Sequence, residues 1–218
     1  MDDAFGTPGE EGFQFFGRVT ASVTHEIKNA LAVIRENAGL MEDLITMGER
    51  KGNLDPARML ALAGKIGKQA MKADGIVQNM NRFAHSMDEP VADLDLGGTV
   101  ELLAALSGRI AAMHGVTFET RVPDAPVRVR TNPVFAETLL WACLEHAMGA
   151  AGPEKRLGIV PEGAEPGGRV RITGVQGGEE PEFPSERHLD LARAIGAEVR
   201  FTPSGDEIVL ELPGAANP

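Results

Sequence analysis

The stretch FQFFGRVTASVTHEIKNALAVIRENAGLMEDLITMGER, residues 13–50, carries apolar residues at the spacing of one long helix. An α-helix turns about 100° per residue, so residues three or four apart share a face. The apolar residues that fall on one stripe are Val19, Val23, Ile27, Ala30, Ile34, Met41 and Ile45. His25 falls almost opposite that stripe, which predicts that its imidazole points into solvent.

His25 has two possible interpretations at this stage. The polar residues on the same outer half of the helix are Arg18, Ser22, Lys28, Asn29 and Glu36. An exposed imidazole among such groups keeps a ring nitrogen free and can act as a nucleophile. The alternative is an ordinary surface histidine on a solvated helix, and helical geometry does not separate the two.

A second long helix is predicted after residues 50–55. Asp55 followed by Pro56 is a typical helix start, with an N-cap and then proline at the first position, and the helix is expected to run to about Ser86. Two long helices joined by a short loop form an antiparallel hairpin, which cannot bury both apolar stripes alone. We therefore expect a homodimer in which two hairpins make a four-helix bundle. Alternatively, the second half of the same chain covers the stripe.

The second half alternates predicted helices and strands. Helices are expected over 99–115, 132–151 and 185–196. Strands are expected over 116–122, with 126–131 as the partner, over 168–175, and in a hairpin across 197–213 that turns at 203–206. This order predicts an α+β sandwich, a mixed sheet with helices on one face.

Four segments follow from this pattern: a flexible N-terminal tail (1–12), the helical hairpin (13–88), a linker (89–98) and the α/β domain (99–213). Pro90, Gly97 and Gly98 interrupt the helical pattern in the linker.

The composition is that of a globular protein, with 43% hydrophobic and 24% charged residues among 218. The net charge of −11 argues against nucleic acid or an anionic membrane as partner. The single cysteine, Cys143, excludes an internal disulfide and fits a reducing compartment. No apolar run approaches the roughly 20 residues that span a bilayer, and the acidic N-terminus is unlike a signal peptide. We expect a cytoplasmic protein.

The HEIKN motif at residues 25–29, followed by the second helix and the α/β elements, resembles the two-component sensor histidine kinases. The resemblance spans roughly residues 13–212 and favours a reactive His25. It implies that His25 is the phosphoacceptor, that Glu26 hydrogen-bonds or deprotonates the imidazole, and that Asn29 helps to place a water that dephosphorylates a partner. One difference is Ala30, where family members often have proline.

The partner implied by this resemblance is a response-regulator receiver domain. Arg18, Ser22 and Lys28 are the candidate partner-binding residues, because the two cations would attract an acidic receiver surface. A solvated helix face with no such role remains open for them, as it does for Glu26 and Asn29.

The second half lacks the residues with which this family holds ATP. Ala142 and His146 stand where the family has two asparagines that bind Mg²⁺ and phosphates, and neither is a good ligand for that hard cation. Gly174 follows the residues VRIT at 170–173, but the aspartate that the family uses to bind adenine is absent there. The glycines that the family has before the helix corresponding to 185–196 are missing. This region also carries four carboxylates, which would repel a triphosphate: Glu179, Glu180, Glu182 and Glu186. ATP binding is therefore not expected.

A phosphoacceptor can work without ATP if it exchanges phosphate with receiver aspartates. Such transfer needs positioning and charge neutralisation, and the receiver can bring Mg²⁺, so no cofactor need bind this chain stably. The chain then resembles the dimeric histidine phosphotransferases of phosphorelays. Two alternatives remain: an active or divergent sensor histidine kinase core, and a non-catalytic dimeric adaptor that binds a response regulator or a kinase.

Overall fold

The computed structural model describes residues 7–51, 53–176, 183–202 and 204–214. The chain divides into two compact units. One consists of Thr20–Arg82, and the other joins Met1–Val19 to Phe83–Pro218. The sequence predicted a single domain over 13–88, whereas both ends of that segment group with the α/β half of the chain.

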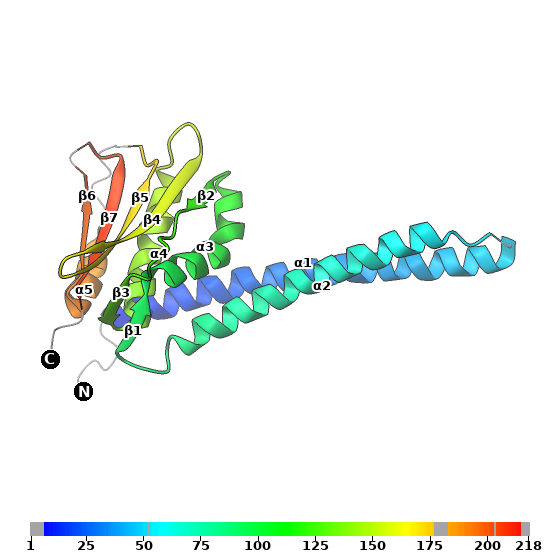
Figure 1. The fold of residues 1–218 in the computed structure, drawn as a ribbon, viewed down its shortest axis with the longest axis horizontal. Helices are drawn as coiled ribbons and strands as arrows, with labels where there is room; N and C mark the ends of the chain where they lie inside the picture. The colour runs from blue at the N-terminus through cyan, green and yellow to red at the C-terminus, as the bar shows by residue number, and fades with distance from the viewer. Residues whose placement is uncertain (1–6, 52, 177–182, 203, 215–218) are drawn as a thin grey trace. The chain divides into compact units, whose positions relative to one another are not determined.

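Two long helices carry the predicted hairpin, α1 (Thr7–Lys51) and α2 (Pro56–His85), as Figure 1 shows. Asp55 caps α2, because its Oδ1 accepts hydrogen bonds from the backbone N–H of Ala57 at 3.1 Å and of Arg58 at 3.2 Å. Pro56 occupies the first helical position, where a missing N–H breaks no helical bond. The predicted hairpin and the start of its second helix are confirmed.

Helix α1 begins at Thr7, so the predicted flexible tail over residues 1–12 is wrong for residues 7–12. Residues 1–6 lie outside the described part of the chain. Aromatic packing explains the longer helix. The Phe15 ring stacks on Trp141 with centroids 5.3 Å apart and meets Phe83 edge-on at 5.1 Å. These contacts hold the first turns of α1 against the α/β domain. Local helix preference does not predict them, because the partners of Phe15 are far away in the sequence.

The predicted linker is also corrected, since residues 89–98 contain a strand and a helix start. Strand β1 (Ala92–Asp95) pairs antiparallel with β3 (Arg128–Thr131). Helix α3 (Leu96–Met113) follows at once, and the Asp95 carboxylate caps it by accepting from the N–H groups of Gly97 and Gly98, each at 3.3 Å. The two glycines therefore open a helix rather than a loop.

The main sheet has five strands in the order β2-β4-β5-β7-β6. Their bounds are β2 Thr117–Thr120, β4 Arg156–Ala164, β5 Gly167–Thr173, β6 Glu198–Phe201 and β7 Glu207–Leu212. β2 runs parallel to β4, and the other neighbours are antiparallel. The expected pairing of 116–122 with 126–131 is wrong, because β2 pairs with β4, a strand that the sequence pattern did not predict.

Three helices cover one face of this sheet: α3, α4 (Pro133–Gly149) and α5 (Glu186–Ile195) (Figure 1). The core lies between these two layers, where Leu157, Ile172 and Leu210 are fully buried. The other face carries ion pairs between neighbouring strands, such as Arg169 with Glu162 at 2.7 Å and Arg171 with Glu207 at 2.6 Å. The predicted α+β class, a helical hairpin followed by a mixed sheet with helices on one face, is confirmed.

Helix α3 is the one helix within the described residues that is long and apolar enough to cross a bilayer, with 18 residues. Half of that stretch is buried inside the protein. Leu96, Leu103 and Leu106 are among its core residues. Packing inside the domain therefore accounts for its apolar composition.

A matched pair of methionines tests where the core lies. Met148 on α4 is 1% exposed, and Met113 at the end of α3 is 63% exposed. We expect Met148→Ala to lower the free energy of unfolding by about 2–5 kcal/mol, because it leaves a cavity. Met113→Ala should change it by less than about 0.5 kcal/mol. Urea denaturation measures both, and equal losses would contradict this assignment of the core.

Candidate functional site

His25 lies on the part of α1 that belongs to the hairpin unit, and its side chain is exposed. The neighbours that were predicted to face inward, Val23 and Ala30, are buried. The helical wheel thus placed His25 on the accessible side of the helix. A second protein can reach an exposed imidazole, whereas it cannot reach a buried one.

Asn29, one turn further along α1, is the side chain that contacts the His25 ring. The Asn29 amide nitrogen and His25 Nδ1 lie 3.1 Å apart, within hydrogen-bond distance. The resemblance assigned this contact with the ring to Glu26. Among the described residues, however, no hydrogen bond joins Glu26 to His25.

The Glu26 carboxylate lies instead near a cation of the other helix. Its Oε2 is 3.9 Å from Nζ of Lys72 on α2. Sequence reasoning missed Lys72, because the register between the two helices decides which residue of α2 stands opposite Glu26. A positive group that faces Glu26, the residue next to His25 in the chain, would attract the charge of an incoming phosphoryl group.

The three candidate partner-binding residues separate in the structure. Lys28 is exposed on the hairpin near His25. Ser22 is only 3% exposed, so its predicted outward position is wrong. Val23 beside it is also buried, which shows that the buried face of α1 is wider at this point than the predicted apolar stripe. Arg18 belongs to the other unit, where its guanidinium donates a hydrogen bond to Glu145 of α4. Arg18 is therefore occupied by an ion pair in its own unit.

Helix α4 carries the two positions where the resemblance looks for metal and phosphate ligands. Ala142 is mostly buried and offers no donor or acceptor side-chain atom. The His146 ring stacks on Phe183, with centroids 4.4 Å apart and planes 9° apart, and meets Phe201 edge-on. This packing holds the imidazole in an aromatic cluster, which gives His146 a structural role.

Gly174 also has a structural explanation. Its φ is +86°, and a Cβ added there would come within 2.3 Å of the carbonyl oxygen of Arg156. Only glycine fits this position. Of the four carboxylates predicted to crowd the region, Glu179, Glu180 and Glu182 lie outside the described residues. Glu186, in the first turn of α5, forms an ion pair with Arg193 at 3.5 Å.

A cavity of about 280 Å³ lies beside Ala142 within the α/β unit. Phe15, Arg18, Trp141, Glu145 and His188 are among its lining residues. Its volume is at or below the lower end of the range for pockets that hold drug-sized ligands, roughly 300–1,000 Å³. Burial lowers the pKa of His188, so at neutral pH this side of the cavity is less positive than a free histidine would make it.

Two further kinds of reactive group are a free cysteine and a cluster of metal ligands. Cys143 is buried, and burial raises the pKa of its thiol to about 12, so it is not a nucleophile at neutral pH. Within the described residues, no group of three or more His, Cys, Asp or Glu side chains is placed to hold a metal ion.

Comparison with known proteins finds similarity to a sensor protein. No family model matches the chain. It is 25% identical over 151 residues to the C4-dicarboxylate transport sensor protein DctB of Pseudomonas aeruginosa. The match covers 66% of this chain and 23% of the relative, so the chain spans about a quarter of that protein's length.

Similar solved structures include a bacterial phosphotransferase, a histidine kinase and an ATP-binding domain. The phosphotransferase is 17% identical with a TM-score of 0.49, covering 91% of this chain and 95% of that one. The Acinetobacter baumannii histidine kinase AdeS is 13% identical with a TM-score of 0.46, covering 87% and 97%. The ATP-binding domain of PrrB from Mycobacterium tuberculosis is 16% identical with a TM-score of 0.47, covering 59% and 100%. Because these TM-scores lie below 0.5, we draw the proposed role of the chain from its own residues.

Proposed function

We propose that this histidine kinase-like chain is a histidine-containing phosphotransfer protein of a two-component phosphorelay. In this role His25 exchanges a phosphoryl group with the aspartates of receiver domains, without using ATP, in the cytoplasm. The observation that carries the proposal is the exposed His25 ring, hydrogen-bonded to Asn29 and open to a second protein.

The state of α4 supports transfer without ATP. The positions that would hold Mg²⁺ and phosphates are an alanine and a histidine stacked on Phe183. Phosphoaspartate is an activated acyl phosphate, so its transfer to histidine needs no nucleotide, only positioning and charge neutralisation. Lys28, three residues from His25 on α1, and Lys72, which faces Glu26, are exposed cations on the hairpin and can supply part of that neutralisation. The receiver supplies Mg²⁺.

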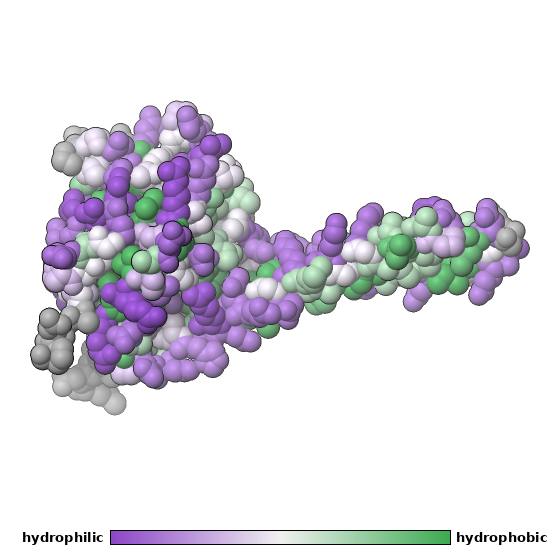
Figure 2. Space-filling model, viewed as in Figure 1, coloured by the Kyte–Doolittle hydropathy of each residue, from purple (hydrophilic) through white to green (hydrophobic). Residues whose placement is uncertain are grey.

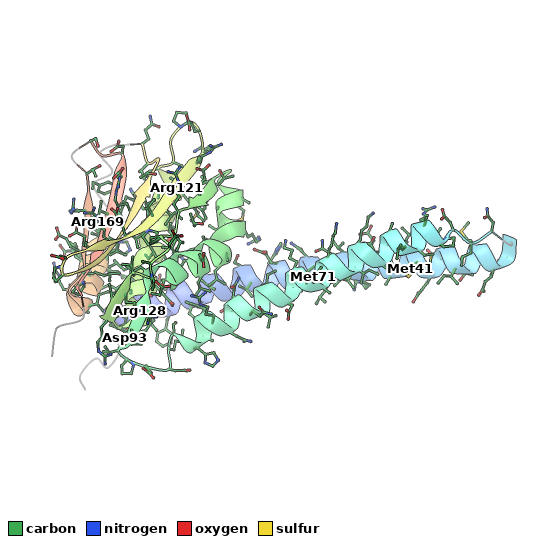
Figure 3. All side chains as sticks on the ribbon, in the orientation of Figure 1. Met41, Met71, Asp93, Arg121, Arg128 and Arg169 are labelled. Carbon is green, nitrogen blue, oxygen red and sulfur yellow. The ribbon has the colours of Figure 1, made fainter. Side chains whose placement is uncertain are left out.

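Apolar side chains on the hairpin support a homodimer. Val33, Leu40 and Met47 recur every seven residues on α1 and are all exposed, as are Leu60 and Met71 on α2. Figure 2 shows apolar surface along the hairpin, and Figure 3 shows Met41 and Met71 on it. Heptad-spaced apolar residues on a two-helix hairpin are typical of packing between helices. A second copy would cover them in a four-helix bundle.

The first test offers the protein two phosphate donors. A panel of receiver domains is phosphorylated with labelled phosphate, purified from the donor, and mixed with the full chain. We expect acid-labile label to move to the chain from at least one receiver, because phosphohistidine is labile in acid. In the second arm, labelled ATP with Mg²⁺ should leave the chain unlabelled.

The active kinase core is the second candidate, and the similarity to a sensor protein favours it. Label from ATP on His25 would replace the phosphotransfer proposal with the kinase. Tight binding to a receiver without transfer from any donor would support the adaptor instead.

A further inference from the structure

We infer that Asn29 is a positioning residue that restrains His25, because its amide donates to Nδ1 and holds the ring in the tautomer with the proton on Nε2. In that state neither ring nitrogen has a free lone pair with which to attack. The kinetic part of this inference rests on the proposed function, since it concerns how readily His25 accepts phosphate. The tautomer itself can be measured without phosphate.

The two atoms in contact decide the direction of the hydrogen bond. The amide nitrogen of Asn29 lies 3.1 Å from Nδ1 of His25, one helical turn away. An amide nitrogen carries two hydrogens and offers no lone pair, so it can only donate. Nδ1 is therefore the acceptor, and a neutral imidazole with an accepting Nδ1 carries its proton on Nε2.

Two other histidines show the two possible arrangements at Nδ1. In His188, Nδ1 accepts a hydrogen bond from the backbone N–H of Ser185 at 3.2 Å, which favours the same Nε2–H tautomer. In His85, Nδ1 lies 2.7 Å from the carboxylate of Asp88, which only accepts, so the proton is on Nδ1 and the lone pair on Nε2. The contact at His25 is of the first kind.

Glu26, to which the resemblance assigned contact with the ring, does not oppose this tautomer. A carboxylate at Nδ1 would favour the Nδ1–H form, as Asp88 does at His85. The Glu26 carboxylate lies instead 3.9 Å from the Lys72 ammonium group. Since no hydrogen bond joins Glu26 to His25 among the described residues, the side chain that sets the tautomer is Asn29.

Transfer from a receiver then begins with release of the Asn29 amide. The ring loses its Nε2 proton to water and takes a proton from water on Nδ1. The lone pair on Nε2, the nitrogen farther from the backbone, forms the bond to phosphorus. The bond from phosphorus to the aspartate oxygen breaks, and the carboxylate leaves with the electron pair. The proton stays on Nδ1, so the ring becomes cationic and the step needs no further reactant.

The tautomers can be read by nitrogen NMR of the full chain labelled with ¹⁵N in histidine, at about pH 8.5, where an ordinary imidazole is neutral. His25→Gln and His85→Gln identify the two sets of signals by their absence. We expect the Nε2–H form at His25 and the Nδ1–H form at His85. Asn29→Ala should raise the ratio of Nδ1–H to Nε2–H at His25 by about 3- to 10-fold, the value of one net hydrogen bond. Asn29→Asp, which offers only acceptors, should make the Nδ1–H form predominate.

Asn37→Ala is the matched control on the same helix. The Asn37 amide donates to the carbonyl oxygen of Val33 at 2.7 Å, so its loss should leave both the tautomer of His25 and the rate of transfer unchanged. Asn29→Ala should speed transfer from a phosphorylated receiver by about the factor by which it raises the tautomer ratio. The inference is overturned by a wild-type His25 in the Nδ1–H form, by a ratio that Asn29→Ala leaves unchanged, or by slower transfer in that variant.

The inference and the proposed function can fail separately. If Asn29→Ala shifts the tautomer but no receiver labels His25 in either protein, the contact with Asn29 stands and the phosphotransfer role falls. If a receiver labels His25 while the tautomer does not respond to Asn29→Ala, the phosphotransfer role stands and the restraint by Asn29 falls.

Discussion

His25→Gln is expected to abolish phosphate transfer from receiver domains while the fold stays unchanged. Glutamine keeps a polar side chain of similar length but has no nucleophilic ring nitrogen. The position is exposed on α1, so its replacement should change the free energy of unfolding by less than about 0.5 kcal/mol. Acid-labile label measures transfer, and circular dichroism with urea denaturation checks the fold.

His85→Gln is the control for this variant. His85 also lies exposed on a long helix, where its ring hydrogen-bonds Asp88 at 2.7 Å. The same substitution there should leave transfer unchanged. Transfer that survives in His25→Gln and disappears in His85→Gln would mean that the phosphoacceptor has been misassigned.

Charges placed on the exposed apolar positions of α1 are expected to break the homodimer that we propose. Leu40 is 40% exposed and Met47 is 52% exposed, and both would be buried in a four-helix bundle. Leu40→Asp with Met47→Asp puts unpaired carboxylates into that interface in both copies. Because a buried charge without a partner costs several kcal/mol, the dissociation constant should rise by about 100-fold or more. Sedimentation at tens of micromolar measures the change.

Val91→Asp is the matched control for the double variant. Val91 is 48% exposed but lies beyond the hairpin, in the segment before β1. The same apolar-to-acidic change there should leave the protein dimeric. A wild-type chain that sediments as a monomer would refute the dimer, and a double variant that stays dimeric would place the interface on other residues.

Local patterns in the sequence were sufficient to predict the hairpin and the exposure of its histidine. Helical periodicity repeats every turn, so the apolar stripe and the opposite position of His25 can be counted along the chain. Asp55 and Pro56 are recognisable as a helix start because capping involves only adjacent residues. The lack of a metal ligand at Ala142 also follows from the sequence alone, since an alanine side chain has no ligand atom in any fold.

Only the tertiary structure decided the contacts between segments that lie far apart in the chain. The β1–β3 pair, the parallel pairing of β2 with β4, and the packing of Phe15 on Trp141 depend on partners tens of residues away. Arg18 was predicted to face a receiver, and it binds Glu145 because α4 packs there. Periodicity along one helix carries no information about what lies opposite it.

The candidate site divides in the same way. The sequence by itself placed His25 and Asn29 one turn apart on the accessible side of a helix, since that spacing is a property of the helix alone. The structure decided that Asn29 contacts the ring and that Glu26 approaches Lys72 of the other helix. Side-chain rotamers and the register between two helices depend on packing in three dimensions. The partner of a side chain therefore could not be predicted from spacing along the sequence.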